Sequence, residues 1–345
     1  GYVMLLFVVA FFAERAARQG RGRWLRSPLV YTLSLSIYCT AWTFYGAVGS
    51  AARSGFEYLT IYLGPSLVML GWWWVLRKLV RVARVQRITS VADLISSRYG
   101  KSTVLGVGVT ILALIGTTPY IALQLQSVTL SVQAFAQNDN ALGDGTAFYV
   151  ALGLAAFTVM FGTRNLDANE RHHGVVMAIA LEAVVKLAAL LAVGGFVVWG
   201  LMGGLSGTLD AIDASALGQV HLDGGRWVGL TMLSAAAFLC LPRMFQVLVV
   251  ENDNDAQLRL ASWAFPAYLL AMSLFIVPIA VAGLQLLPEG ANPDLFVLTV
   301  PLSQGQDALA VLVFLGGFSS ATSMVIVAAI AVSTMVSNHV VLPIW

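Results

Sequence analysis

Charged side chains are scarce in this chain of 345 residues. Only 10% of its residues are Asp, Glu, Lys or Arg, whereas soluble domains carry roughly 25%. Hydrophobic residues make up 59% of the chain, and the mean hydropathy is +0.82. A chain this apolar needs lipid around it, so the composition predicts an integral membrane protein.

Cysteines and catalytic motifs are also few. The two cysteines, Cys39 and Cys240, lie in apolar runs, with neither a disulfide framework nor metal-ligand spacing. The sequence holds no nucleophile elbow, P-loop, HExxH or CxxC motif. His172 and His173 are adjacent, which favours two loop histidines over a metal site. We therefore expect no catalytic site and no metal other than sodium in this chain, and we expect no nucleic-acid partner.

Long apolar runs dominate what is present. A helix that crosses a bilayer needs about 20 mostly apolar residues. Nine runs are candidates: 1–13, 28–50, 57–79, 104–136, 146–162, 174–203, 227–250, 258–287 and 307–335. They lack the alternation of barrel strands, so the sequence predicts an all-α integral membrane fold. The run 104–136 is long enough to tilt, and Pro119 predicts a kink in it.

Lysine and arginine predict the orientation. They concentrate in segments 15–26 and 77–101, which lie on one side of the predicted membrane. By the positive-inside rule that side is cytoplasmic. Gly1 is then outside and Trp345 inside, in a multi-pass protein of the bacterial inner (cytoplasmic) membrane. Within the second segment, 84–103 is expected to form a short amphipathic helix.

Four polar clusters interrupt the predicted spans, at 34–50, 117–127, 235–246 and 316–323. Each can bind a ligand or an ion. Each can also be structural, through small-residue packing, interhelical hydrogen bonds, a proline kink or hydroxyls bonded to their own helix. In the third cluster, Arg243 is expected to face the cytoplasm.

Glu182 and Lys186 stand in an otherwise apolar run, four residues apart with the acid first. That spacing places both on one helix face, roughly 12 and 18 Å from the start of the helix. Each charge costs about 2.5–3.5 kcal/mol at that depth. We expect an intramembrane charge pair, within salt-bridge distance and facing protein, that serves either as a structural link or as part of a gate.

Six blocks in order resemble the sodium:solute symporter family, and more closely the symporter-like N-terminal membrane module of CbrA-type sensor histidine kinases. They are Tyr38–Gly49, Pro119–Val128, Phe161–Gly174, Ala180–Gly194, Phe238–Asn252 and Phe318–Ala328.

The resemblance implies a LeuT-type fold built from two inverted repeats. Residues 1–345 would form a single symporter-like membrane domain, truncated after about nine transmembrane helices. Segment 1–13 would be an extra helix, 28–203 core helices one to five and 227–335 core helices six to eight. The remaining core helices and the kinase part would be missing.

The resemblance also implies a sodium ion between core helices one and eight. Its ligands would be the carbonyls of Ser36, Cys39 and Gly316 and the hydroxyls of Ser319 and Ser320. The chain departs from proline-type symporters at Tyr38, where they carry an aspartate, and at Asn169 and Glu170, where they carry a Thr-Asp pair. Sodium and proton coupling therefore both stay open.

The implied substrate site lies near mid-membrane, where broken helices meet. Its residues would be Tyr38, Thr40, Trp42, Tyr120, Gln124 and Phe238. The implied function is the sensory membrane domain of a histidine kinase, which binds and transports a histidine-like amino acid. ATP and a response regulator would act through the missing kinase part. The alternatives are a plain sodium- or proton-coupled transporter and a receptor that binds without transport.

Overall fold

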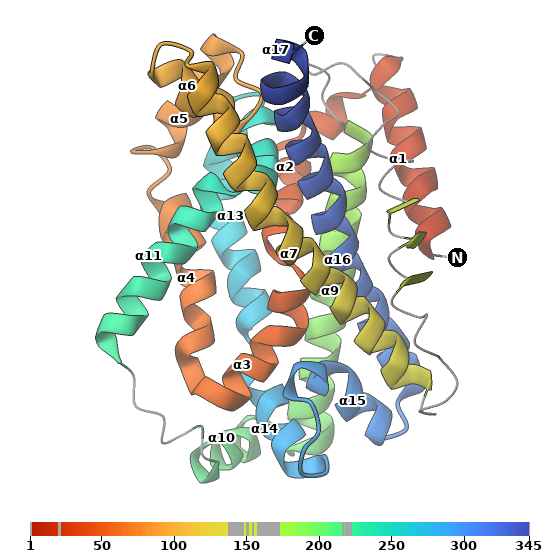
Figure 1. Ribbon diagram of the computed structural model, residues 1–345. Helices are drawn as coiled ribbons and strands as arrows, with labels where there is room; N and C mark the ends of the chain where they lie inside the picture. Colours follow the sequence, from red (N-terminus) through yellow and green to blue (C-terminus); the bar gives the residue numbers. More distant parts are fainter. Residues whose placement is uncertain are drawn as a thin grey trace.

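The computed structural model describes residues 2–19, 22–136, 148–149, 152–153, 155–156, 173–215, 217 and 223–344. Within these ranges the regular structure is helical, and no strand occurs (Figure 1). The prediction of an all-α protein is confirmed for this part of the chain.

The first half of the chain runs from an outer helix through a broken span to a long oblique helix. Its elements are α1 (Tyr2–Arg18), η1 (Gly22–Arg26), α2 (Pro28–Ser34), η2 (Leu35–Tyr38), η3 (Trp42–Gly46), α3 (Ala47–Ser54), η4 (Gly55–Tyr58), α4 (Leu59–Leu70), α5 (Leu76–Gln86), α6 (Val91–Arg98) and α7 (Thr103–Ala136).

The second half contains three long spans and one bent span. Its elements are α9 (His173–Gly195), η5 (Phe196–Leu201), α10 (Leu205–Ala214), α11 (Gly224–Cys240), α12 (Pro242–Phe245), η7 (Gln246–Val250), α13 (Asp255–Ser273), α14 (Ile276–Leu286), η8 (Pro293–Leu295), α15 (Phe296–Ser303), α16 (Asp307–Val336), η9 (Ser337–Val341) and α17 (Leu342–Ile344).

Five of the predicted spans have counterparts that are long and apolar enough to cross a membrane. In the described ranges these are Thr103–Phe135, Gly174–Leu201, Asp255–Leu286, Asp307–Ile344 and the bent pair Gly224–Cys240 with Pro242–Val250. The predicted span 146–162 lies largely outside the described residues. So do Asn169, Glu170 and His172, together with most of the block that ends at Gly174.

Two expectations need correction. The predicted span 57–79 ends early, because α4 stops at Leu70 and a turn separates it from the basic helix α5. The predicted amphipathic helix 84–103 is shorter, since α6 covers only Val91–Arg98 and begins where the Ser90 hydroxyl accepts from the Asp93 N–H. By contrast, α7 runs without interruption through Pro119 and crosses the bundle obliquely (Figure 1).

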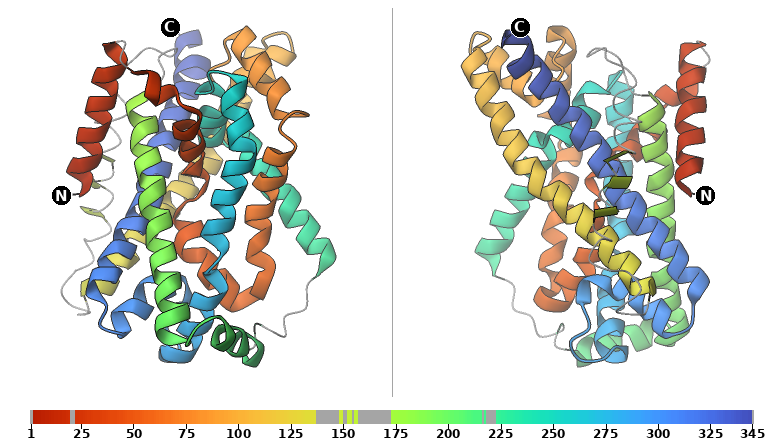
Figure 2. Two further views of the ribbon diagram at one scale, coloured as in Figure 1. Left: turned by 180° about the vertical axis from the view of Figure 1, so that it is seen from behind. Right: turned by 45° about the vertical axis from the view of Figure 1, so that its right-hand side comes forward.

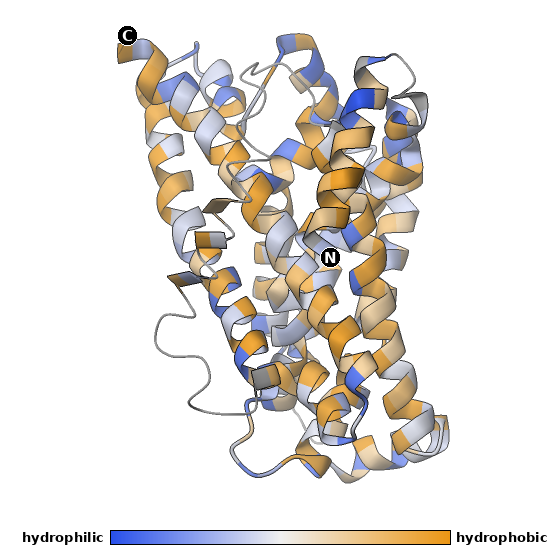
Figure 3. Ribbon diagram, turned by 90° about the vertical axis from the view of Figure 1, so that its right-hand side faces the viewer, coloured by the Kyte–Doolittle hydropathy of each residue, from blue (hydrophilic) through white to orange (hydrophobic). Residues whose placement is uncertain are grey.

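The broken first span lies inside the bundle. Its segment η2 contacts α9, α12 and α16, while α16 also packs on α9 and α7 (Figure 2). Helix α1 lies at the periphery against α9. Hydrophobic residues dominate the helices of the face shown in Figure 3, as expected for contact with lipid.

The two ends of the bundle differ in character. Helices α5 and α6 lie at the same end as α17, and α10, α14 and α15 lie at the opposite end (Figure 1). Asp255 joins α13 to α5 through Arg77 and Arg84, both at 3.1 Å. At the other end Arg53 binds Asp294 at 2.7 Å. The basic segments and the C-terminus thus share one end; its assignment to the cytoplasm stays a prediction.

Close helix packing depends on glycine. At Gly64 of α4, an added Cβ would lie 2.5 Å from the Ala235 nitrogen and 2.6 Å from the Thr231 carbonyl oxygen, both on α11. Backbone atoms cannot move aside as a flexible side chain can. Helices α4 and α11 can therefore pack this closely only if residue 64 has no side chain.

We therefore expect Gly64→Ala to lower the melting temperature of the purified protein, since overpacking costs about 1–3 kcal/mol. Gly229→Ala is the matched control, because Gly229 lies on α11 with open space around it. Equal melting temperatures for both variants would contradict the close packing of α4 on α11.

Candidate functional site

The first span is broken between Tyr38 and Trp42. A 3-10 turn ends at Tyr38, Cys39 is extended with φ −78° and ψ 92°, and a π-type turn begins at Trp42. The hydroxyl of Thr43 donates to the Thr40 carbonyl at 2.7 Å. Such local bonds compete with a regular helix. The break leaves backbone groups that need partners from elsewhere, because lipid offers none.

Lys186 supplies the donors. Its side chain is fully buried, and its Nζ donates to the carbonyl oxygens of Ser36 at 2.8 Å and Cys39 at 3.0 Å. Hydrogen bonds from a charged group contribute about 1.5–3 kcal/mol each. Lys186 of α9 therefore satisfies two of the backbone carbonyls that the break in the first span leaves without helical partners.

Glu182 binds a third helix. Its side chain is 2% exposed, and its Oε1 accepts from the Thr322 hydroxyl of α16 at 2.8 Å. Both charges face protein, but no ion pair joins Glu182 to Lys186 directly among the described residues. The expected salt bridge is wrong, because each group finds a closer partner on another helix. One turn of α9 thus links η2 to α16.

The expected sodium ligands lie on neighbouring elements, since η2 contacts α16. Their oxygens already have partners within the protein. Lys186 donates to the carbonyls of Ser36 and Cys39. Ser320 donates to the Gly316 carbonyl at 2.9 Å, and Ser319 donates to the Leu315 carbonyl at 2.7 Å. With the ammonium in this position, the oxygen set does not fit a sodium ion.

A second break faces the first. Helices α11 and α12 meet at a bend of 57°, where Leu241 is extended and Pro242 cannot continue the helical hydrogen bonds. Helix α12 contacts η2. Tyr38 meets Phe238 edge to face at 5.6 Å between ring centroids, which joins the two broken spans.

The expected substrate residues gather around these breaks. Gln124 of α7 accepts the Ala41 N–H at 2.9 Å, and the hydroxyls of Tyr120 and Thr40 lie 3.3 Å apart. Trp42 is half-buried and is joined to Thr40 through its backbone N–H. Whether any of them binds solute stays a prediction.

Arg243 was misplaced by sequence reasoning. It is 4% exposed rather than facing the cytoplasm, and its guanidinium lies 4.6 Å from the centre of the Tyr120 ring. In the described part of the chain it has no acidic partner, and its Nε–H has no acceptor. The sequence does contain an indication of this position: an arginine follows a helix-breaking proline in an apolar run. A charged residue inside a membrane span is usually functional.

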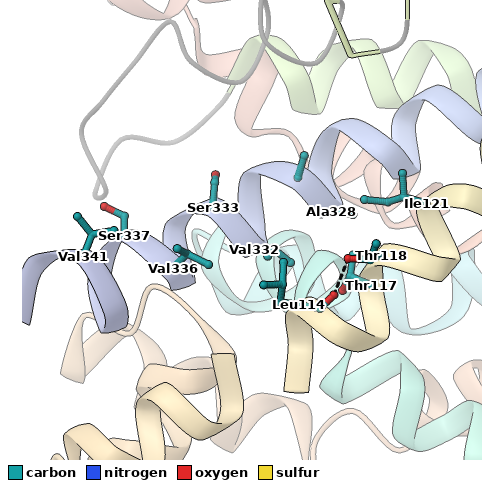
Figure 4. A pocket seen from close by; sticks show the side chains of 11 residues that line it. Leu114, Thr117, Thr118, Ile121, Ala328, Val332, Ser333, Val336, Ser337 and Val341 are labelled. Atoms are coloured by element: carbon teal, nitrogen blue, oxygen red, sulfur yellow. Dashed lines mark hydrogen bonds between the residues drawn. The ribbon is translucent and has the colours of Figure 1, made fainter. Parts of the chain in front are cut away.

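A separate cavity of about 430 Å³ lies between α7 and α16 (Figure 4). Its lining includes Leu114, Thr118, Ile121 and Val332, and Thr118 donates to the Leu114 carbonyl of its own helix. None of the expected substrate residues lines it. This mostly apolar cavity is therefore distinct from the site at the breaks.

Comparisons with known proteins agree with this geometry. The chain superposes on a Na⁺-coupled sialic acid symporter, solved in a substrate-bound outward-open state, with a TM-score of 0.72 and 14% identity over 99% of this chain and 73% of that one. The fold is that of a LeuT-type symporter. The several helices able to span a membrane and this likeness make the chain a multi-pass membrane protein.

Sequence similarity points the same way. An uncharacterized symporter of Bacillus subtilis (strain 168), YhjB, is 24% identical over 289 residues, which is 81% of this chain and 56% of that protein. The chain thus spans about half the length of this symporter relative. No protein-family model matches the chain. The chain is thus similar to symporters in both sequence and fold.

Gln124 gives a test of the first break. We expect Gln124→Leu to lower the melting temperature of the purified protein, because a buried N–H left without an acceptor costs about 1–3 kcal/mol. Gln126→Leu is the matched control, since Gln126 is exposed on the same helix. If both variants melt like the wild type, Gln124 does not support the break.

Proposed function

We propose that this chain is the solute-binding and solute-translocating domain of a cation-coupled symporter, and that its solute is a small carboxylate, with a histidine-like amino acid as the leading class. Buried Arg243 carries the proposal, because it stands beside both breaks without an acidic partner in the described part of the chain.

A buried guanidinium needs acceptors. It presents several N–H donors and never loses its charge in proteins. The Tyr120 ring offers a cation–π contact, which stabilises the charge without neutralising it. A carboxylate would supply two acceptor oxygens in the bidentate geometry that arginine favours. The solute carboxylate is therefore assigned to Arg243.

Aromatic groups beside Arg243 suit an apolar or aromatic side chain on the solute. Tyr120 lies under the guanidinium, and Tyr38 and Phe238 form an edge-to-face pair at the neighbouring break. Phe238 in turn stacks on Phe265 of α13, with ring centroids 5.7 Å apart. A flat, partly polar side chain such as imidazole would stack on such rings at low entropic cost.

The resemblance to CbrA-type kinases supports coupling of solute binding to a histidine kinase and a response regulator. The plain transporter is the alternative, and both likenesses to symporters favour it. Autophosphorylation of the full-length protein, measured with and without solute, separates the two. A change on adding solute supports the sensor, and phosphorylation that is absent or unaffected supports the transporter.

The carboxylate assignment predicts that the wild type binds histidine, or the best amino acid in a thermal-shift screen, at least about ten-fold more tightly than the corresponding amide. Arg243→Met should remove this preference, because the lost charge-assisted pair accounts for more than about 1.4 kcal/mol. Arg259→Met is the matched control, since Arg259 is exposed on α13.

Binding affinities are measured by calorimetry on the purified domain. Equal binding of acid and amide by the wild type, or an unchanged preference in Arg243→Met, would contradict the role of Arg243. Uptake of the labelled solute into vesicles then distinguishes a transporter from a receptor.

A further inference from the structure

The position of Lys186 bears on which cation occupies the break in the first span. Two of the oxygens that the family resemblance assigns to sodium, those of Ser36 and Cys39, bind the Lys186 ammonium instead, at 2.8 and 3.0 Å. The side chain is fully buried, so this ammonium is separated from bulk water. A lysine on α9 thus places a permanent neighbour at the break in the first span.

An ammonium group and a sodium ion require similar ligands at such a site. Each is a monovalent cation that seeks several oxygens, and each suits the uncharged carbonyls of a broken helix. The ammonium has three donors, of which the two carbonyls take two. A second cation among the same oxygens would be repelled by the first, and in a low-dielectric interior this repulsion is strong.

We propose that Lys186 is a tethered cation that takes the place of a sodium ion at the first break. A sodium ion can leave its site by diffusion, whereas the lysine is held covalently to α9. The Ser36 and Cys39 carbonyls therefore keep the same cation whether or not sodium is present.

Loss of the Lys186 side chain would alter the packing around the break. The Ser36 and Cys39 carbonyls would then lack a donor unless a free cation took its place. Because η2 contacts both α9 and α16, an empty position beside Ser36 and Cys39 loosens the contact between these spans. The solute residues of the proposed function begin at Tyr38, directly beside this contact.

The groups near Lys186 show which other charges and hydroxyls the cluster contains. Glu182, on the same helix, binds Thr322 of α16. Cys39 lies on the broken span, and Tyr268 of α13 donates to the Ala183 carbonyl at 3.0 Å. Tyr2 of α1 shares a hydrogen bond with Ser319 of α16. Within the described part of the chain, α16 offers hydroxyls here and Glu182 is the carboxylate of the cluster.

The first test needs no solute and so does not depend on the proposed function. The melting temperature of the purified domain is measured in sodium, choline and ethylammonium chloride at equal ionic strength. We expect no difference for the wild type. Lys186→Ala should be less stable in choline and should gain several degrees in sodium or ethylammonium, each of which can occupy the vacated oxygens. Val184→Ala, an exposed position on the same helix, should behave like the wild type.

Two results would overturn the tethered cation. One is a wild type that sodium stabilises, a measurement that stands even if Lys186→Ala does not fold. The other is a folded Lys186→Ala variant that ignores both sodium and ethylammonium.

The second test rests on the proposed function and compares solute affinity in sodium and in choline. Wild-type affinity should be equal in the two buffers, because Lys186 already occupies the oxygens. Lys186→Ala should bind solute more tightly in sodium than in choline, whereas Val184→Ala should behave like the wild type. A wild type that binds solute more tightly in sodium would contradict the tethered cation. Absence of any solute binding would instead count against the proposed function alone.

Discussion

Hydrocarbon offers no hydrogen bonds, and the arrangement of this protein follows from where it leaves backbone groups without helical partners. The break in the first span exposes carbonyls at Ser36 and Cys39 and an N–H at Ala41. Lys186 of α9 and Gln124 of α7 satisfy them. Each of these side chains therefore fixes a helix against the break, and together they hold the centre of the bundle.

The buried charges follow from the same constraint. Glu182 and Lys186 lie one turn apart on α9, yet each makes its hydrogen bond to a different element. Such links stabilise a fold only while all members remain paired, because removing one partner leaves a buried charge uncompensated. Arg243 differs from them in having an aromatic ring but no acid beside it in the described residues. The absence of an acid beside Arg243 in the described residues suits a solute that carries a negative charge.

The sequence predicted five spans that the described residues contain, because an apolar run long enough to cross a bilayer has few other uses. It failed where the deciding contact is distant in the chain. The spacing of Glu182 and Lys186 favoured a mutual salt bridge, since spacing rules compare residues on one helix. The true partners of Lys186 lie near residues 36–39, beyond any such rule. Arg243 was expected to face the cytoplasm, but it lies buried beside the bend at Pro242.

The state of Lys186 in a sodium-rich environment is decided most directly by an experimental structure. The domain would be solved in sodium buffer and again with thallium, whose strong scattering marks monovalent cation sites. The account predicts the Lys186 Nζ within hydrogen-bond distance of the Ser36 and Cys39 carbonyls in both structures, with no ion between them. A cation peak bound by those carbonyls and by Ser319 and Ser320, with Lys186 turned away, would contradict it.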